Sequence, residues 1–481
     1  MRKSVKINYL LNLGYQLLLI ALPLITTPYI SRVLGDYAIG SYSFTQSVVT
    51  YFTLLGCIGL GLYGQREIAY CQNDFQKRTK LLYELVLLKL ISVTVSFLLY
   101  FLVIQSVEKF QLLFYIQMID LIANIFDINY FYQGLEDFSK IITRNVIVRF
   151  ISIACVFLLV KSPEDLPLYV LIQSLSILFG NMSMWLTLPK YLVRLDQYSL
   201  EIKKHLRPTL VLFLPQVAVS VYTVLDRTMI ELLTGNTREI GYYEQAQKIV
   251  KLALTIVTSL GTVMLPRISS LYAGEQNEAI KRYIYQSLQF VMLIGCPIMF
   301  GLIGVAHNLV PWFLGDQFLA SIPLVMITAP IVIFIGMSNV IGIQFLLPTR
   351  RQKAYTVSTL VGSGVNLVLN LVLIPRFLSL GATIASVIAE LSVTAFQFYC
   401  VHDVIRLRPI LKENSKYLLM SLAMFAIVYP MSIWLKPSVL YTVLLMGIGA
   451  SFYFIGLILV KDSLIYGIID TIKQKSKKLK G

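Results

Sequence analysis

Charge is the scarcest feature of this chain. Only 14% of its 481 residues are charged, whereas 57% are hydrophobic and the mean hydropathy is +0.73. Soluble domains carry about 25% charged residues, so this chain could not cover a water-exposed surface. Apolar runs of the roughly 20 residues that a helix needs to cross a bilayer recur from end to end. The composition predicts an all-α polytopic membrane protein, whose first apolar run is too long for a cleavable signal and is expected to remain as a span.

Residues that would carry catalysis or bind metal are also few. The three histidines and the five cysteines, at positions 57, 71, 155, 296 and 400, are scattered, which argues against a disulfide framework and a ligand cluster. No Walker sequence or zinc-ligand pattern occurs, so we expect no metal and no bound cofactor. The stretch GLGLYG (59–64) matches a dinucleotide fingerprint in letters, but it lies at the end of a span with no strand before it. Close helix packing explains its small residues better.

The net charge of +16 indicates membrane topology rather than a nucleic-acid partner, because cytoplasmic loops of membrane proteins are rich in Lys and Arg. With both termini in the cytoplasm, 31 of the 41 basic residues fall in predicted cytoplasmic segments and 6 in predicted outer segments. The fourteen predicted spans are about 9–31, 41–63, 81–104, 112–133, 146–160, 168–187, 209–233, 243–265, 283–305, 322–347, 356–375, 381–401, 417–435 and 439–460.

An internal repeat organises the chain. The stretch 23–46 reads PLITTPYISRVLGDYAIGSYSFTQ, in which a Gly-Asp turn at Gly35 separates two apolar runs. Its motif Ile39-Gly40-x-Tyr42-x-x-x-Gln46 returns 201 residues later as Ile240-Gly241-x-Tyr243-x-x-x-Gln247. We therefore predict two six-span lobes, 1–187 and 209–401, joined by a basic cytoplasmic linker, 188–208. Residues 402–481 would hold spans thirteen and fourteen and a basic tail. Substrate sites of such duplicated transporters usually lie between the repeats.

Charged side chains at membrane depth are the most informative residues. A charge at the bilayer centre costs about 2.5–3.5 kcal/mol on insertion scales, so such a residue faces a partner or a watery cavity. We expect the basic ones to line a cavity for a large anion. Arg149 is expected at the start of a short fifth span, and the others lie within or beside predicted spans: Arg32, Lys89, Arg227, Lys248 and Lys251. Structural ion pairs, or side chains that reach the membrane surface, are the open alternative.

Helix-breaking and amide residues mark expected bends and packing contacts. Asn366 and Asn370 share a helix face, and Pro375 is expected to stop that helix at the outer surface. Small residues and Glu390 follow in the next span. Structural or gating roles are expected for Pro28, Gly35, Gln46, Asn366, Asn370 and Pro375. Helix–helix packing is the simpler reading of the two asparagines.

These motifs together resemble the polysaccharide repeat-unit flippases, often called Wzx-like. They belong to the superfamily that also holds the MATE multidrug exporters and the peptidoglycan lipid flippases. The resemblance spans nearly the whole chain. It is carried by PLITTPYISRVLG (23–35), the following GSYSFTQ (40–46), GQREIA (64–69), YQGLEDF (132–138), Arg144-Asn145, and the signature from Asn366 to Glu390.

The resemblance implies a V-shaped pair of six-helix lobes around a cavity, with spans thirteen and fourteen lining a lipid-facing groove. It implies a secondary transporter, not an enzyme, of the bacterial cytoplasmic membrane. The cargo would be an undecaprenyl-pyrophosphate-linked oligosaccharide for capsule or exopolysaccharide, moved from the inner to the outer leaflet. Its partners would be membrane lipids and, further, the polysaccharide polymerase and chain-length machinery. The basic residues named above would hold the pyrophosphate.

A proton or sodium gradient is the expected energy source, because no nucleotide motif is present. The candidate coupling carboxylates are Asp120, Asp127, Asp226 and Glu390. Asp127 is preferred because Asp120, seven residues earlier, is expected on the same helix face. An ion pair between Asp127 and Lys89 on the neighbouring span is the alternative.

Two other functions remain in competition. A drug exporter of the MATE type would favour an acidic cavity for cationic drugs, whereas the basic candidates named above favour an anionic cargo. A membrane-embedded glycan polymerase or ligase would need a long external loop with catalytic residues. The longest predicted external loop, about 306–321, holds a single acid, Asp316, and no Lys or Arg.

Overall fold

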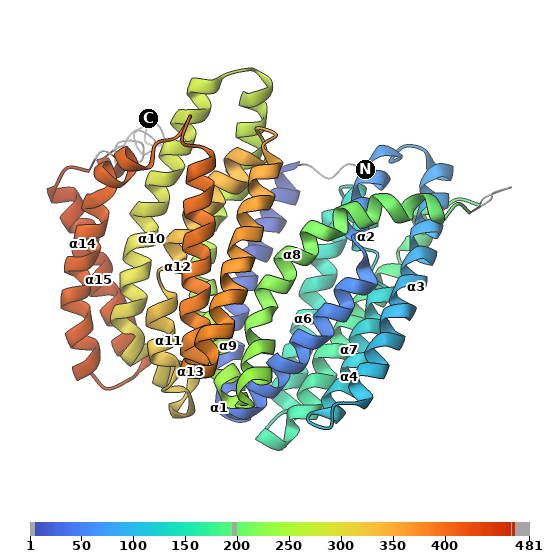
Figure 1. Cartoon of the computed structure of the whole chain (residues 1–481), viewed down its shortest axis with the longest axis horizontal. Coiled ribbons are helices and arrows are strands. Elements are labelled where there is room, and N and C mark those ends of the chain that lie inside the picture. Colours follow the sequence, from blue (N-terminus) through green and yellow to red (C-terminus); the bar gives the residue numbers. More distant parts are fainter. Residues whose placement is uncertain (1–4, 195–199, 463, 467–481) are drawn as a thin grey trace, which may run out of the picture. The chain divides into compact units, whose positions relative to one another are not determined.

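The computed structural model describes residues 5–194, 200–462 and 464–466, and this part of the chain is helical with no strand (Figure 1). The all-α prediction is confirmed. The long helices are α1 (Val5–Cys57), α2 (Leu60–Tyr70), α3 (Phe75–Gln105), α4 (Gln111–Ile125), α5 (Asn129–Gly134), α6 (Phe138–Leu159), α7 (Leu166–Trp185), α8 (Lys203–Thr234), α9 (Thr237–Ala273), α10 (Asn277–Leu314), α11 (Ser321–Thr328), α12 (Ile331–Ser338), α13 (Gln352–Cys400), α14 (Leu407–Trp434) and α15 (Val439–Leu459). Short 3-10 turns at Pro163–Asp165, Leu188–Tyr191 and Asp316–Phe318 and a π-helix at Asn339–Leu346 complete the described elements.

The chain forms two compact units, Met1–Gly241 and Tyr242–Gly481. Helix α8 belongs to the first unit, where it packs on α1 and α2. In the second unit α10 is the central helix and packs on α14, α15 and α12. These units are defined by contacts between residues, whereas the predicted lobes 1–187 and 209–401 and the linker 188–208 were defined by the sequence repeat. The predicted lobes and linker therefore stay a prediction.

Two helices that run on in the chain are each interrupted by a non-helical residue. A straight helix of the 53 residues of α1 would be about 80 Å long, far more than the roughly 30 Å of a bilayer's apolar core. The backbone of α1 turns at Gly35, with φ 76° and ψ 180°, and that of α13 turns at Leu378, with φ 54°. The amide of Gln397 then donates to the Ser358 hydroxyl at 3.1 Å, so the two halves of α13 lie side by side.

The predicted spans all fall on helical segments. Ten described stretches are long and apolar enough to cross a membrane. Gln352–Cys400 contains two predicted spans, and Ala21–Tyr70 contains the second predicted span and the end of the first. The remaining two predicted spans fall on α8 and α9, which carry Asp226, Arg227, Lys248 and Lys251.

Three local expectations are wrong. The fourth span is not one helix: α4 ends at Ile125 and α5 begins at Asn129, so Asp127 lies in the connection and does not share a helix face with Asp120. The fifth span is not short, because α6 starts at Phe138 and places Arg149 at its middle. The helix of Pro375 continues to Leu378, since proline removes one backbone hydrogen bond but leaves the last turn in place.

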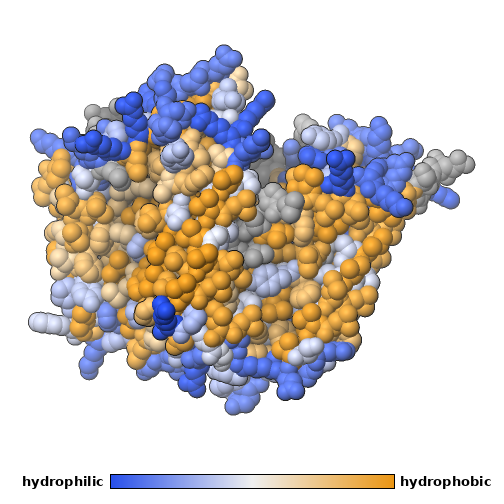
Figure 2. Space-filling view, viewed as in Figure 1, coloured by the Kyte–Doolittle hydropathy of each residue, from blue (hydrophilic) through white to orange (hydrophobic). Residues whose placement is uncertain are grey.

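The predicted external loop at 306–321 is also mostly absent. Helix α10 runs to Leu314, and a 3-10 turn at Asp316–Phe318 leads almost directly into α11. A short helical connection of this kind offers no room for a catalytic loop. Within each unit, apolar side chains cover the middle of the helices and hydrophilic ones gather toward their ends (Figure 2). This is the pattern of helices that cross a bilayer.

The repeat-related glycines meet in the first unit. A Cβ atom on Gly40 would press on the carbonyl of Thr237, and one on Gly241 would press on the carbonyl of Asp36. Asp36 and Thr237 are themselves 201 residues apart, so the two contacts are reciprocal under the repeat. Only glycine allows backbones to approach so closely. The contact joins the segment after the Gly35 turn to the start of α9.

Candidate functional site

Lys89 and Asp127, predicted as anion ligand and coupling carboxylate, bind each other. The Lys89 ammonium, only 3% exposed, donates to the Asp127 carbonyl oxygen at 2.7 Å and lies 3.7 Å from the Asp127 carboxylate. The other carboxylate oxygen accepts from the backbone N–H of Asn129 at 3.0 Å, which fixes the turn before α5. The Tyr130 ring lies 6.0 Å from the ammonium. This geometry is that of a structural ion pair, the alternative that the sequence left open.

Breaking this pair is expected to lower stability. Asp127→Ala should cost about 1–3 kcal/mol, because the buried Lys89 ammonium keeps only a carbonyl partner. The double variant Lys89→Met/Asp127→Ala should recover most of the loss, since no buried charge remains. Thermal unfolding of the purified protein in detergent measures both. Glu278→Ala, at an exposed Lys281–Glu278 pair, is the control and should change stability by less than about 0.5 kcal/mol. Equal melting temperatures for Asp127→Ala and the control would contradict the pairing.

Asp120 lies in a buried polar cluster of the first unit. Its side chain is 7% exposed and hydrogen-bonds to Ser174 of α7 and Gln46 of α1. Gln117, one turn earlier on α4 and fully buried, donates to the Gln46 amide oxygen at 3.1 Å. One Asp120 carboxylate oxygen and the Gln117 amide oxygen have no hydrogen-bond partner among the described residues. The cluster thus holds two buried acceptors that a proton or small cation would satisfy.

Arg149 is an exposed basic candidate of the first unit. It lies near the middle of the 22-residue α6 and is exposed between the exposed apolar residues Ile147 and Phe150. It makes no hydrogen bond or ion pair with any residue that the structure describes. An arginine at membrane depth is costly without a partner or water. Its guanidinium suits a bidentate contact to a phosphate oxygen pair.

The other predicted residues of the first unit lie around α1 and α8. Asp226 is buried and Arg227 half-buried, and both lie close enough to Tyr51 of α1 to act on it electrostatically. The Tyr51 hydroxyl lies 3.0 Å from the hydroxyl of Thr228, which also contacts Ser47 at 2.8 Å. Arg32 is exposed near the Gly35 turn, and Pro28 lies inside α1 before that turn. A row of polar groups therefore joins α1 to α8.

The second unit holds the remaining predicted residues. Because α9 is continuous, Glu244, Lys248 and Lys251 form the expected single stripe, with Lys248 half-buried and Lys251 exposed. Asn370 donates to the Asn366 side-chain oxygen at 3.0 Å, and both are fully buried. This confirms that they share a face. Glu390, half-buried, lies near Tyr355.

One buried polar cluster, formed by Glu84, His205 and Tyr63, was not predicted from the sequence. The Glu84 carboxylate of α3, 1% exposed, lies 2.8 Å from Nε2 of His205 at the start of α8. The Nδ1 atom of the same imidazole lies 2.7 Å from the Tyr63 hydroxyl of α2. Glu84 and His205 are 121 residues apart, so no spacing rule connects them. The only available signal was a glutamate near the start of the predicted span 81–104, which also holds Lys89.

Comparison with known proteins decides the family. A family model described as "Polysaccharide biosynthesis protein" matches residues 5–272, more than half of the chain. The chain belongs to the polysaccharide biosynthesis protein family. A second model, described as "MatE", matches residues 212–372 of this family member. The resemblance expected from its sequence motifs is confirmed.

Relatives of this family member include transporters by description. A protein of Escherichia coli K12 described as "Putative O-antigen transporter" is 24% identical over 387 residues, which cover 79% of this chain and 93% of that one. A protein of Shigella dysenteriae with the same description is 23% identical, with 79% and 95% coverage. The length of the alignments shows similarity through most of both chains.

Solved structures share the fold. The lipid II flippase MurJ in an inward closed conformation aligns with a TM-score of 0.75 at 16% identity, covering 95% of this chain and 99% of that one. An inward-facing multidrug resistance MATE transporter aligns with a TM-score of 0.57 at 12% identity, covering 82% and 99%. With the apolar helices and the family match, these findings make the chain a multi-pass protein of the bacterial inner membrane.

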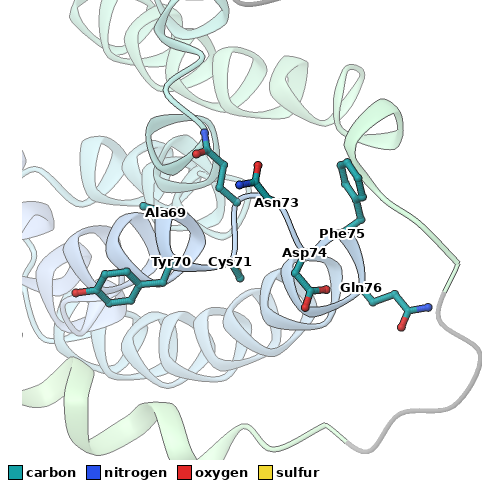
Figure 3. A pocket seen from close by; sticks show the side chains of 8 residues that line it. Ala69, Tyr70, Cys71, Asn73, Asp74, Phe75 and Gln76 are labelled. Carbon is teal, nitrogen blue, oxygen red and sulfur yellow. The ribbon is translucent and has the colours of Figure 1, made fainter.

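The hollow at the α2–α3 turn lacks the features of an enclosed binding site. It measures about 640 Å³, but consecutive residues 69–76 line it and it is open. Figure 3 shows Asn73 and Phe75 on one side of the turn and Cys71 and Asp74 on the other. Asp74 accepts from the Lys77 N–H at 3.0 Å as the cap of α3, and this hydrogen bond lowers the pKa of the carboxyl. No group of three potential metal ligands occurs in the described ranges either.

Proposed function

We propose that this protein is a flippase that moves undecaprenyl-pyrophosphate-linked oligosaccharide repeat units across the cytoplasmic membrane for surface polysaccharide synthesis. The observation that carries the proposal is Arg149, an exposed cation in the middle of a membrane helix of a polysaccharide biosynthesis protein. A pyrophosphate is a doubly anionic group that such an arginine can bind through paired hydrogen bonds. The transporter descriptions of the relatives and the fold of the lipid II flippase support it.

In the proposal, cations on α9 form a second candidate anion site, which lies in the second unit. Lys248 and Lys251 share the polar stripe of α9 with Glu244, so the stripe keeps an excess of positive charge. Membrane lipids would accept the polyprenyl chain, and the outer leaflet would deliver the glycan to a polymerase and its chain-length machinery. The cycle would proceed by alternating access, in which the path opens to one side of the membrane at a time.

An ion gradient supplies the energy in this proposal, with Asp120 as the coupling group. Asp120 is buried, bonds only to neutral side chains and retains an acceptor oxygen without a partner. A buried carboxylate without a cationic neighbour is costly when charged, so it is suited to bind a proton or a sodium ion. Asp127 is the weaker candidate because Lys89 already neutralises it.

A drug exporter and an enzyme are the competing functions. The match of the "MatE" model to residues 212–372 keeps the exporter in view. However, the cation excess of α9 and the exposed Arg149 suit an anionic cargo rather than a cationic drug. The enzyme lacks support because α10 occupies most of the predicted external loop.

The substrate is tested by deletion and complementation. A strain without this protein should accumulate lipid-linked oligosaccharide in the inner leaflet and lose its surface glycan. Lys248→Ala and Lys251→Ala should each lower surface glycan at least tenfold at unchanged protein level, which corresponds to losing about 1.4 kcal/mol of anion binding. Lys281→Ala, at an exposed pair on α10, is the control and should display normal glycan. Full complementation by both α9 variants would remove these lysines from the site.

A further inference from the structure

The start of α8 is held against α2 and α3 by the buried chain of contacts Tyr63–His205–Glu84. An ionised carboxylate only accepts hydrogen bonds, so Nε2–H of His205 donates to Glu84. The ring is then held on its other side by the Tyr63 hydroxyl. His205 is 3% exposed, and Thr209, one turn later on α8, is fully buried. We call Tyr63, Glu84 and His205 the latch.

Glu84 also holds the residues that lead into α8. Its carboxylate accepts from the backbone N–H of Glu201 at 2.9 Å and lies 3.2 Å from the Lys204 ammonium and 3.8 Å from that of Lys80. Burial lowers the pKa of Lys204, but hydrogen bonds to Glu201 and Glu84 outweigh it, so the pKa lies above its ordinary value. Lys204 therefore remains a cation beside the latch. One buried carboxylate thus gathers α3, α8 and the chain before α8.

The opposite end of α8 has a contact of a different kind. Lys109, in the α3–α4 connection, binds the Glu231 carboxylate at the end of α8 and donates to the Thr237 hydroxyl at 2.9 Å. Its side chain is 45% exposed. An exposed lysine can exchange its partners for water at little cost. The side chains of the latch are buried and cannot make that exchange without first becoming exposed. Both ends of α8 are therefore held in this structure, but the latch is the more enclosed of the two.

We propose that the latch closes the cytoplasmic end of the transport path and opens once in each transport cycle. This inference rests on the proposed alternating-access function. In the sequence repeat, α8 is the first span of the second copy, whereas α2 and α3 belong to the first copy. Alternating access requires the two copies to separate on one side at a time. His205 lies in the predicted linker, one turn before the first span of the second copy, so the latch holds that span against the first copy. This is the end of α8 that the distribution of basic residues places in the cytoplasm.

A reversible crosslink across the latch tests this directly. Lys80→Cys and Lys204→Cys, in the full-length protein without its native cysteines, place thiols on α3 and α8 on either side of Glu84. A short thiol-cleavable crosslinker should reduce flipping of lipid-linked oligosaccharide in proteoliposomes at least tenfold, and reductant should restore it. The control pair, Gln72→Cys and Leu135→Cys, joins two turns inside the first repeat, where Gln72 donates to the Leu135 carbonyl at 3.2 Å. Its crosslink should leave flipping unchanged.

A labelling experiment reports on the latch without a substrate. A single cysteine at Thr209 should react slowly with a membrane-impermeant maleimide added from the cytoplasmic side. Glu84→Gln should raise that rate at least tenfold, because it removes the charged acceptor of His205 and Lys204. Lys109→Gln, at the other end of α8, should not raise it. An unchanged rate in Glu84→Gln would show that the latch does not hold α8.

The outcomes separate this inference from the proposed function. If the uncrosslinked double-cysteine protein flips the glycan lipid and its crosslinked form flips equally fast, the latch does not open during transport. If the uncrosslinked protein and the cysteine-free parent flip no lipid-linked glycan at all, the proposed function fails. In that case the labelling rates still decide whether the latch holds α8.

Discussion

Replacing Arg149 by alanine is expected to abolish surface glycan while leaving the amount of protein in the membrane unchanged. The side chain is exposed at the middle of α6 and makes no hydrogen bond or ion pair with the described residues, so its removal breaks no contact there. A charge-assisted hydrogen bond to a buried group is worth about 1.5–3 kcal/mol. Loss of a bidentate contact to pyrophosphate should therefore weaken binding roughly 10- to 100-fold or more. Flipping measured in proteoliposomes against substrate concentration gives that change.

Two further variants separate the loss of the paired hydrogen bonds of Arg149 from the loss of a positive charge on α6. Arg149→Lys keeps the charge but loses the paired geometry, so it should be impaired less than Arg149→Ala. Lys140→Ala, on the same helix near its start, removes a basic residue that lies over the Tyr191 ring, outside the apolar core. It should behave as the unchanged protein. Normal flipping by Arg149→Ala would show that Arg149 faces lipid or an unoccupied surface and would remove the main support for an anion site on α6.

Asp120→Asn is expected to remove the part of transport that depends on an ion gradient. The amide is nearly the same size as the carboxyl and can still hydrogen-bond to Ser174 and Gln46, so the fold should persist. The amide cannot take up a proton, and it carries no negative charge to neutralise a sodium ion. Flipping in proteoliposomes under imposed proton and sodium gradients should fall to the rate without a gradient. The gradient that stimulates the unchanged protein identifies the ion.

The matched comparison is Asp127→Asn. It should lower thermal stability by loosening the Lys89 pair but keep the gradient dependence of the protein that remains folded. The opposite pattern, with gradient dependence lost in Asp127→Asn and retained in Asp120→Asn, would restore the assignment that the sequence favoured. Loss in neither variant would move the coupling role to Asp226 or Glu390.

Local patterns were sufficient for the helices. Hydropathy depends only on neighbours in the chain, and it placed the predicted spans on helical segments of the described structure. Local patterns failed where a helix stops for a tertiary reason: α4 ends before Asp127 because Lys89, from α3, binds the backbone and side chain there. They also failed at α6, where Lys140 and Arg144 made the first turns look like a loop. Arg144 in fact donates to Asn181 and Asn129 inside the bundle.

The sequence by itself determined that this is an all-helical membrane protein with a repeat, charged residues within its spans and motifs of the polysaccharide biosynthesis family. These properties follow from composition and spacing, which the bilayer constrains directly. Only the tertiary structure decided which charges are neutralised. Lys89 is paired with Asp127, Glu84 with His205 across 121 residues, and Asp120 with neutral groups alone. A side chain's electrostatic role depends on what packs within a few ångströms of it, and distances along the chain do not carry that information.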